Sequence, residues 1–175
     1  MRADGIRNPM VRYFNRDRNS PPFVVMMDST NLKCIHMATD LTFDGTFQYA
    51  PNNMPNSQIY TMHATYHQLP NFNNNFLVGI AFVQNKDIPT YEQIFNVIKE
   101  QLIAEFGDIG CHKTIHMDHE IAAITAARRV FPDWTMHSCY FHFGKNLRTK
   151  MGQVLLDTEE VGKWFSALCG NYQMN

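Results

Sequence analysis

Two aspartates at the edges of predicted strands are the residues of this chain best suited to do chemistry. Asp44 lies in the string FDGTF (residues 43–47), and Asp118 lies in the string IHMDHE (residues 115–120). Hard divalent cations prefer oxygen ligands, and two such ions can clamp the attacking and leaving oxygens of a phosphoryl transfer. If the two strands are neighbours, this pair of carboxylates predicts a divalent-metal phosphoryl-transfer site.

Each aspartate also has a purely structural explanation. Asp-Gly pairs often accept hydrogen bonds from nearby backbone N–H groups, which would account for Asp44. Asp40 is close enough to be a rival for Asp44, but no glycine follows it. Asp118 is a residue type that caps helices, and a helix is predicted to start at Glu120. We expect Glu120 itself to face the positive end of that helix rather than to bind a metal.

A cysteine and a histidine spaced three residues apart, Cys139 and His142, follow the second aspartate. A zinc site would need two more ligands, and the nearest candidates, His137 and Cys111, show no zinc-finger spacing. We therefore favour a role for the pair beside the metal ligands or in positioning DNA. A buried cysteine and a hydrogen-bonded histidine that dock a helix would explain the pair equally well.

One short basic cluster follows on the same predicted helix and consists of Lys145, Arg148 and Lys150. A helix surface with such residues and aromatic neighbours can bind phosphates. A solvated helix face explains the same pattern, so these three residues are candidate DNA contacts only.

The spacing of apolar residues, which predicts the strands and helices that position these candidates, changes along the chain from a strand pattern to a helical pattern. Residues 1–22 are polar and unpatterned, and they predict a flexible arm. Apolar runs and alternating patterns predict strands at 23–27, 38–49, 59–66, 76–83, 113–117 and 134–138. The run at 76–83 is apolar throughout, as expected for a strand covered on both faces.

Helical spacing appears after the fourth of these strands. Thr90 and Gln93 form a capping box pattern, apolar residues recur up to Phe106, and Gly107 can end the helix in a left-handed conformation. Residues 120–130 predict a second helix, and residues 143–152 a third. Hairpin-like strands followed by alternating helices and strands predict an α/β fold with a mixed sheet, antiparallel on one side and parallel on the other.

The bulk composition excludes several classes of protein. The chain has 175 residues, 45% of them hydrophobic, which favours one domain with a substantial core. Its formal net charge is −1, so any strong affinity for nucleic acid must be local or come from residues outside this chain. The four cysteines form no Cys-x-x-Cys pair, and no apolar run approaches a membrane span. We expect a soluble intracellular protein.

Four strings in order along the chain resemble the Mutator-like element (MULE) transposase domain, a member of the ribonuclease H-like DDE transposases. The strings are DGTF (44–47), QIYTMH (58–63), MDHE (117–120) leading into AAI (122–124), and CYFHF (139–143). The resemblance covers about residues 38–150. It implies a ribonuclease H-like fold with a mixed five-stranded sheet flanked by helices, followed by the start of a helical insertion.

The resemblance also implies the site and its partners. Asp44 and Asp118 would be the first two members of a carboxylate triad that holds Mg²⁺ or Mn²⁺, and Cys139 and His142 would be the C-x-x-H signature. The substrate would be DNA, both transposon ends and target, in the nucleus. A homo-oligomer is compatible with the family, and no membrane is implied.

The third acidic residue decides how the C-terminal part is interpreted. Glu159 and Glu160 follow Asp118 at a tempting separation, but Asp157 and Glu160 form a capping box that opens an amphipathic helix. In the resembling family the third acid comes after a helical insertion. We therefore expect a flexible arm at 1–22, the ribonuclease H-like core at 23–153, and a truncated insertion at 154–175. The chain would then be a fragment that lacks the catalytic Glu and is inactive alone.

Two alternative functions remain open from the sequence. The first is a catalytically inactive, transposase-derived protein that binds DNA or another protein, and the missing third acid and the neutral charge favour it. The second is a ribonuclease H-like nuclease that cuts RNA or hybrids. The retained pair Asp44 and Asp118 favours the metal-dependent DNA enzyme.

Overall fold

The structure is a computed structural model that describes residues 11–14, 22–46, 57–66 and 75–139, together with His142, Gly144 and Thr149. The chain divides into two compact units, residues 1–139 and 140–175, and each is described by itself. His142, Gly144 and Thr149 are helical, but the rest of the helix predicted at 143–152 and the predicted insertion at 154–175 lie outside the described residues.

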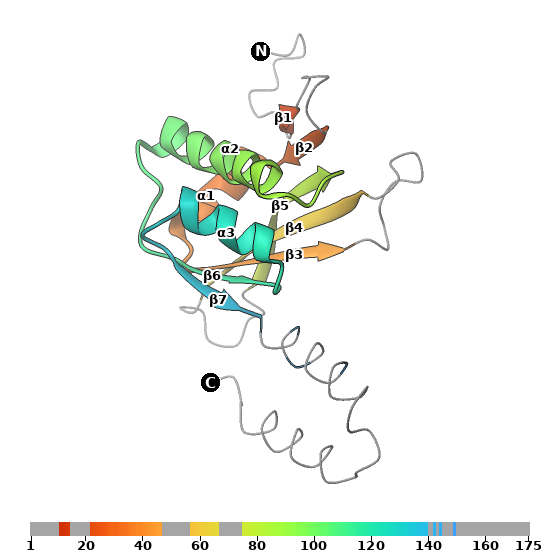
Figure 1. Cartoon of the computed structure of the whole chain (residues 1–175). Helices are drawn as coiled ribbons and strands as arrows, with labels where there is room; N and C mark the ends of the chain where they lie inside the picture. Colours follow the sequence, from red (N-terminus) through yellow and green to blue (C-terminus); the bar gives the residue numbers. More distant parts are fainter. Residues whose placement is uncertain are drawn as a thin grey trace. The chain divides into compact units, whose positions relative to one another are not determined.

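Seven strands of the described residues form one mixed sheet in the order β1-β2-β5-β4-β3-β6-β7 (Figure 1). Their bounds are β1 Val11–Phe14, β2 Phe23–Met26, β3 Asp40–Thr46, β4 Gln58–Thr65, β5 Asn75–Val83, β6 Thr114–Met117 and β7 Thr135–Ser138. Strands β3, β4 and β5 pair antiparallel, whereas β3, β6 and β7 pair parallel. The five strands β5-β4-β3-β6-β7 are the predicted mixed sheet, and the expected α/β, ribonuclease H-like architecture is confirmed.

Strands β1 and β2 extend this five-stranded sheet at the β5 edge. Strand β2 pairs antiparallel with β5, as Val25 opposite Ala81 illustrates, and β1 pairs antiparallel with β2. Strand β1 lies within the polar segment where the sequence analysis expected no strand. Its four residues are held by backbone pairing to β2, which does not require an alternating apolar pattern of its own.

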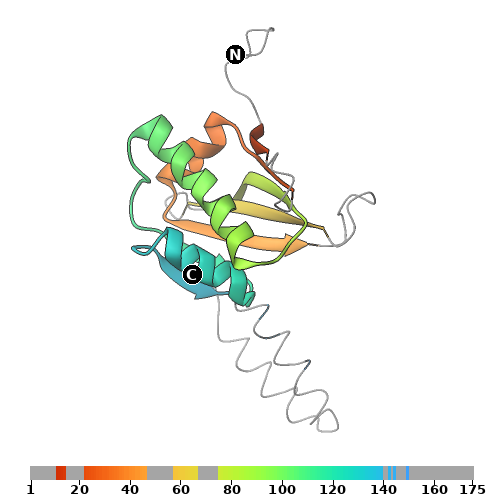
Figure 2. The same cartoon turned by 45° about the horizontal axis from the view of Figure 1, so that its top comes forward.

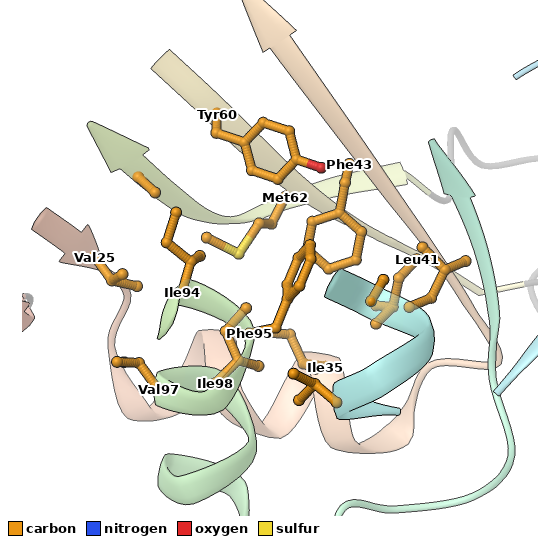
Figure 3. Packing of buried hydrophobic residues seen from close by; sticks show 14 of the residues in the cluster. Val25, Ile35, Leu41, Phe43, Tyr60, Met62, Ile94, Phe95, Val97 and Ile98 are labelled. Atoms are coloured by element: carbon orange, nitrogen blue, oxygen red, sulfur yellow. The ribbon is translucent and has the colours of Figure 1, made fainter. Parts of the chain in front are cut away.

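Three helices, α1 (Ser29–Met37), α2 (Ile88–Phe106) and α3 (Ile121–Val130), lie on one face of the sheet (Figures 1 and 2). Strand residues that point to this face are buried, and those that point to the other face are partly exposed, as the alternation along β3, β4 and β6 shows. In Figure 3, Phe43 and Tyr60 of the sheet pack against Phe95 of α2. This burial of one apolar sheet face against amphipathic helices supplies the main stabilisation of the unit.

Helix α1 was not predicted from the sequence. Asp28 is its N-cap and accepts from the backbone N–H of Asn31 at 2.7 Å, while the Asn31 side chain accepts from the backbone N–H of Asp28 at 2.9 Å. The helix has nine residues, of which Leu32 and Ile35 are buried, so its apolar face is too short to give a clear periodic pattern.

The predicted capping box of α2 is wrong, although the helix itself and its end at Gly107 are confirmed. Asp87 is the N-cap and accepts from the backbone N–H of Thr90 at 2.9 Å, and Pro89 lies in the first turn. Thr90 is buried inside the helix, three residues after the cap. Gly107 adopts φ = 85°, a left-handed conformation in which glycine is favoured.

The prediction that the strand at 76–83 is covered on both faces is also wrong for its first residues. Phe76 and Leu77 are 46% and 50% exposed, whereas Val78, Ala81 and Val83 are buried. Ile80 and Phe82, on the other face from Ala81 and Val83, are partly exposed, so the rest of β5 is fully buried on one face only.

A buried lysine fixes the alignment of β3 with β6 at the end opposite to the candidate site. Lys113 donates from Nζ to the carbonyl oxygens of His36 at 2.9 Å and Ala38 at 2.7 Å, and it is fully buried. Burial lowers the pKa of Lys113. Because the ammonium satisfies carbonyls at the end of α1, it ties that helix end to the start of β6.

None of the helices in the part of the chain that the structure describes combines the length and the apolar character needed to cross a membrane.

Candidate active site

The two aspartates stand side by side at one edge of the sheet because of the strand register. Phe43 of β3 pairs with Met117 of β6 in parallel register, and Asp44 and Asp118 are the next residues of the two chains. The site therefore lies where the neighbours of β3 change from antiparallel β4 to parallel β6. Such a switch point is where α/β sheets place their ligands.

The same register continues into β7. Met117 pairs with Ser138, so Cys139 is the next residue along, and its backbone N–H donates to the carbonyl of Met117 at 2.7 Å. Three residues that the sequence analysis selected, Asp44, Asp118 and Cys139, thus occupy consecutive positions across the carboxyl ends of the three parallel strands. The row has this order because β3, β6 and β7 are adjacent in the sheet.

Asp44 is held within β3 rather than in a turn. It pairs with Thr61 of β4, and the Thr61 hydroxyl donates to the backbone carbonyl of Asp44 at 3.1 Å. The side chain is partly exposed and projects from the same sheet face as Thr42, opposite to the buried Phe43. Asp44 is therefore a strand residue and does not lie in an Asp-Gly turn.

Asp118 does not cap α3, which corrects the alternative weighed from the sequence. Helix α3 begins at Ile121, and its N-cap residue is Glu120, which makes no side-chain capping hydrogen bond. The Asp118 carboxylate instead accepts from the backbone N–H of His119. Asp118 follows β6 directly and is partly exposed, so its carboxylate is not buried in the core.

Asp40, the rival for Asp44, has a different partner. Its carboxylate lies 3.1 Å from Nε2 of His116, and the Thr39 hydroxyl donates to it at 2.8 Å. The His116 ring in turn packs edge-on against His137, with ring centroids 5.6 Å apart. Asp40 lies four residues before Asp44, at the other end of β3, and this pairing gives it a structural role.

Aromatic residues fill the buried face of the sheet at the end where Asp44 and Asp118 lie. Tyr60 stacks on Phe43 with ring centroids 6.0 Å apart and tilts against Tyr91 of α2 at 5.3 Å. Tyr60 is 3% exposed, and its hydroxyl has no hydrogen-bond partner among the described residues. Burial raises the pKa of Tyr60, with smaller contributions from Tyr91 and from the carboxylates of Glu120, Asp44 and Asp118. The three carboxylates therefore all act electrostatically on this one hydroxyl.

Gly45, the glycine of the DGTF string, is required for space. A Cβ atom at this position would lie 2.8 Å from Oε1 of Gln58 and 3.5 Å from Cδ2 of Tyr60. Gln58 is buried and donates from Nε2 to the Tyr91 hydroxyl at 2.5 Å. The missing side chain at Gly45 thus makes room for a buried polar group next to Asp44.

Sequence reasoning underestimated the buried polar residues at this end of the sheet. Tyr91 is fully buried and its hydroxyl accepts from Gln58. Burial, followed by the charge of Glu120, raises the pKa of Tyr91. Gln58 and Tyr60 lie in the QIYTMH string, where the alternation of residues 58 and 60 on one strand face was the available signal. Tyr91 gave no signal because only tertiary packing brings α2 to this edge.

All the remaining candidates except Cys139 fall in the second unit of the chain. His142 is helical and partly buried there, whereas Cys139 ends the first unit and is also partly buried. Lys145, Arg148 and Lys150 lie outside the described residues, as do Glu159 and Glu160. Their roles stay predictions.

The donor set at this edge suits a hard divalent cation only in part. Asp44 and Asp118 offer carboxylate oxygens from adjacent strand ends, which is the ligand type that Mg²⁺ and Mn²⁺ accept. Within the part of the chain that is described, no group of three or more His, Cys, Asp or Glu residues could hold a metal ion. Two protein ligands are consistent with Mg²⁺, which keeps several waters and is commonly bound through one or two carboxylates.

The fold and the site together define the class of protein. A mixed sheet in the order β5-β4-β3-β6-β7, with paired aspartates at the switch between its antiparallel and parallel halves, is a ribonuclease H-like α/β domain. The family model of the MULE transposase domain matches residues 41–146, and the chain belongs to this family. Comparison with curated proteins gives no significant match.

Proposed function

We propose that the edge formed by Asp44 and Asp118 is a divalent-metal site for DNA phosphoryl transfer in a transposase. Membership of the MULE transposase domain family indicates a transposase-related function with DNA as partner, and divalent metal is general to the chemistry of that family. The observation that carries the finer proposal is the parallel register of Phe43 with Met117, because it makes the two aspartates neighbours.

The residues of this chain would bind and orient the reacting groups. The carboxylates of Asp44 and Asp118 would hold Mg²⁺ or Mn²⁺ at the carboxyl end of β3 and β6, and the strand pairing keeps their backbones in fixed register. When bound, such a cation supplies activation of the attacking oxygen and stabilisation of the leaving oxygen. Full strand cleavage and transfer would also need a third acidic residue, which is part of the proposal.

The direct test is calorimetric titration of Mg²⁺ and Mn²⁺ into the wild-type chain and into Asp44→Asn and Asp118→Asn. Asp40→Asn is the matched control, because Asp40 lies on the same strand face as Asp44 and is paired with His116. We expect the first two variants to lose most of the binding heat and the control to keep it. Equal heats in all four proteins would refute a metal site at this edge.

The inactive alternative makes a different prediction in the same set of proteins. A transposase-derived protein that only binds DNA would bind a DNA duplex without Mn²⁺ and would show the same affinity after Asp44→Asn. A nuclease acting on RNA or hybrids would instead be revealed by Mn²⁺-dependent cleavage of those substrates and not of DNA. The proposed transposase predicts cleavage of DNA that depends on both aspartates.

Location and assembly follow from the same proposal. DNA as substrate implies that the protein works in the nucleus, and fluorescence microscopy of a tagged protein tests this. A homo-oligomer would let one assembly engage two DNA ends, and sedimentation of the protein with and without DNA tests that part.

A further inference from the structure

A cysteine and a buried lysine lie side by side where the chain enters β6, at the opposite end of that strand from the two aspartates. The Lys113 ammonium donates to the sulfur of Cys111, with Nζ and Sγ 3.8 Å apart. It also donates to the carbonyl oxygens of His36 at 2.9 Å and Ala38 at 2.7 Å. An ammonium has three N–H donors, so the two carbonyl oxygens and the sulfur together satisfy all of them.

The two members of this pair differ in their exposure to solvent. Cys111 is exposed and is a free thiol, whereas Lys113 is 0% exposed. The Lys113 ammonium also lies 5.5 Å from the centroid of the Trp134 ring. A reagent that arrives from solvent therefore meets the sulfur first, and the shielded amine is the group placed to react with the product.

The backbone of the preceding turn brings the pair against the end of α1. Gly110 has φ = 80°, a left-handed conformation that favours glycine. A Cβ atom at Gly110 would collide with the carbonyl oxygen of His36 and would lie 3.1 Å from Lys113 Nζ. The close approach of this turn therefore depends on glycine, and within it the Cys111 thiol donates to the Ala38 carbonyl at 3.6 Å.

We propose that Cys111 and Lys113 form a modification site, at which hydrogen peroxide oxidises the thiol and the lysine amine captures the product as a reversible sulfur–nitrogen bond. In the first step the thiol and hydrogen peroxide give a sulfenic acid and water. In the second step Nζ attacks the sulfur, the S–N bond forms and the S–O bond breaks. Water leaves, together with one proton from the ammonium. Two thiols of a reductant restore the cysteine and the amine, and the reductant becomes a disulfide.

The surroundings of the pair favour both steps. Among the described cysteines Cys111 is the exposed one, while Cys34 and Cys139 are partly buried, so peroxide reaches Cys111 most easily. The amine is already in hydrogen-bond contact with the sulfur, so its attack needs little movement. Burial lowers the pKa of Lys113, although the nearby Cys111 and Asp108 oppose the shift. A buried lysine of this kind supplies the neutral, nucleophilic amine more readily than an exposed one.

The modification weakens the tie between α1 and the start of β6. The linked nitrogen keeps a single N–H donor in place of the three of the ammonium. It cannot donate to the carbonyl oxygens of both His36 and Ala38, so one buried carbonyl loses its donor, which destabilises the fold. This inference does not depend on the proposed metal site, because the pair lies at the other end of β6.

The test treats the whole chain with hydrogen peroxide, unfolds it and digests it with trypsin in the absence of reductant. Trypsin cuts after Lys99, Lys113 and Arg128, so the unmodified protein gives a peptide of residues 100–113. The sulfur–nitrogen bond removes the charge that trypsin recognises at Lys113. We expect the oxidised protein to give residues 100–128 as one peptide, lighter by two hydrogen atoms than the unlinked sequence. Dithiothreitol should restore the cut.

Two variants and an unfolding measurement separate the steps. Cys111→Ser removes the sulfur and should give only the peptide 100–113 after peroxide treatment. Lys113→Met removes the amine and should accumulate the sulfenic acid at Cys111, which dimedone labels. The oxidised wild type should unfold at a lower urea concentration than the reduced protein, and dithiothreitol should reverse the shift. The digest of the wild type decides the question even if Lys113→Met does not fold.

Three results would overturn the inference. If the oxidised wild type still gives the peptide 100–113 with Cys111 as a sulfenic or sulfinic acid, the Lys113 amine does not capture the product. If Cys111 is found joined to another cysteine, the modification is a disulfide. If Cys111 does not react with peroxide in the folded protein, it is not a modification site.

Discussion

Gly45→Ala tests why a glycine follows the first aspartate. Among the described glycines, only Gly107 and Gly110 have positive φ, so Gly45 is not required by its backbone conformation. The reason is the space occupied by Gln58, since a Cβ atom would lie 2.8 Å from its Oε1. That is about 0.6 Å short of ordinary van der Waals contact, so the Gln58 amide must move.

The cost follows from what the Gln58 amide does. Overpacking of a buried site costs about 1–3 kcal/mol, and loss of the hydrogen bond to Tyr91 adds about 1 kcal/mol. Replacing glycine by alanine restores about 0.4–1 kcal/mol by restricting the unfolded chain. We therefore expect Gly45→Ala to lower the free energy of unfolding by about 2 kcal/mol. For a chain of this size that corresponds to a Tm about 4–8 °C lower.

Urea unfolding of four proteins measures this effect: the wild type, Gly45→Ala, Gln58→Ala and the double variant. Without the Gln58 side chain, the nearest remaining contact of the new Cβ atom is Cδ2 of Tyr60 at 3.5 Å, an ordinary distance. Gly45→Ala should then cost close to nothing in the Gln58→Ala background, a coupling of about 2 kcal/mol. An equal cost in both backgrounds would refute the steric reasoning.

Three further substitutions probe the cap of α2 and the two buried tyrosines, Tyr60 and Tyr91. Asp87→Ala should lower the free energy of unfolding by about 1 kcal/mol at neutral pH; because hydrogen bonds to Thr90 lower the pKa of Asp87, this contribution is present above about pH 4 and is lost as the pH falls through the folded-state pKa. Chemical denaturation at pH 7 and pH 3 checks it, and an undiminished difference at pH 3 would contradict the assignment. Tyr60→Phe should leave stability unchanged or raise it by about 1 kcal/mol, since the buried hydroxyl makes no hydrogen bond, whereas Tyr91→Phe should lower it by about 1–3 kcal/mol. Thermal melts compare the two, and equal losses would count against the difference between these tyrosines.

The predictions that succeeded depend on local patterns that the structure preserves. Alternating and continuous apolar runs located β2 to β7 within a few residues. Successive side chains of a strand point to opposite faces, so a strand with one buried face has an apolar residue at every second position. Gly107 ended α2 as expected, since few residues other than glycine adopt its φ of 85°. The motif strings around Asp44 and Asp118 indicated the family, which the match over residues 41–146 shows.

The predictions that failed concern helix starts, where more than one nearby residue could serve as the cap, and one helix whose apolar pattern is short. Thr90 and Gln93 fit a capping box, but Asp87 three residues earlier also fits a cap, and Pro89 suits the first turn that follows it. Asp118 fits an N-cap, but α3 begins only at Ile121 and its N-cap residue is Glu120. Helix α1 has only two buried residues, so its apolar pattern is too short to distinguish it from a loop.

The sequence by itself determined the kinds of group available for chemistry: two carboxylates, each directly after or near the end of a strand, and the order of strands and helices around them. Only the tertiary structure decided that these groups are neighbours, because strand register depends on side chains from many distant segments packing under the same helices. It also brought Gln58 and Tyr91 together from positions 33 residues apart, and no local pattern reports such a contact. The sequence therefore identifies the two carboxylates, and the fold determines that they are neighbours and which residues pack around them.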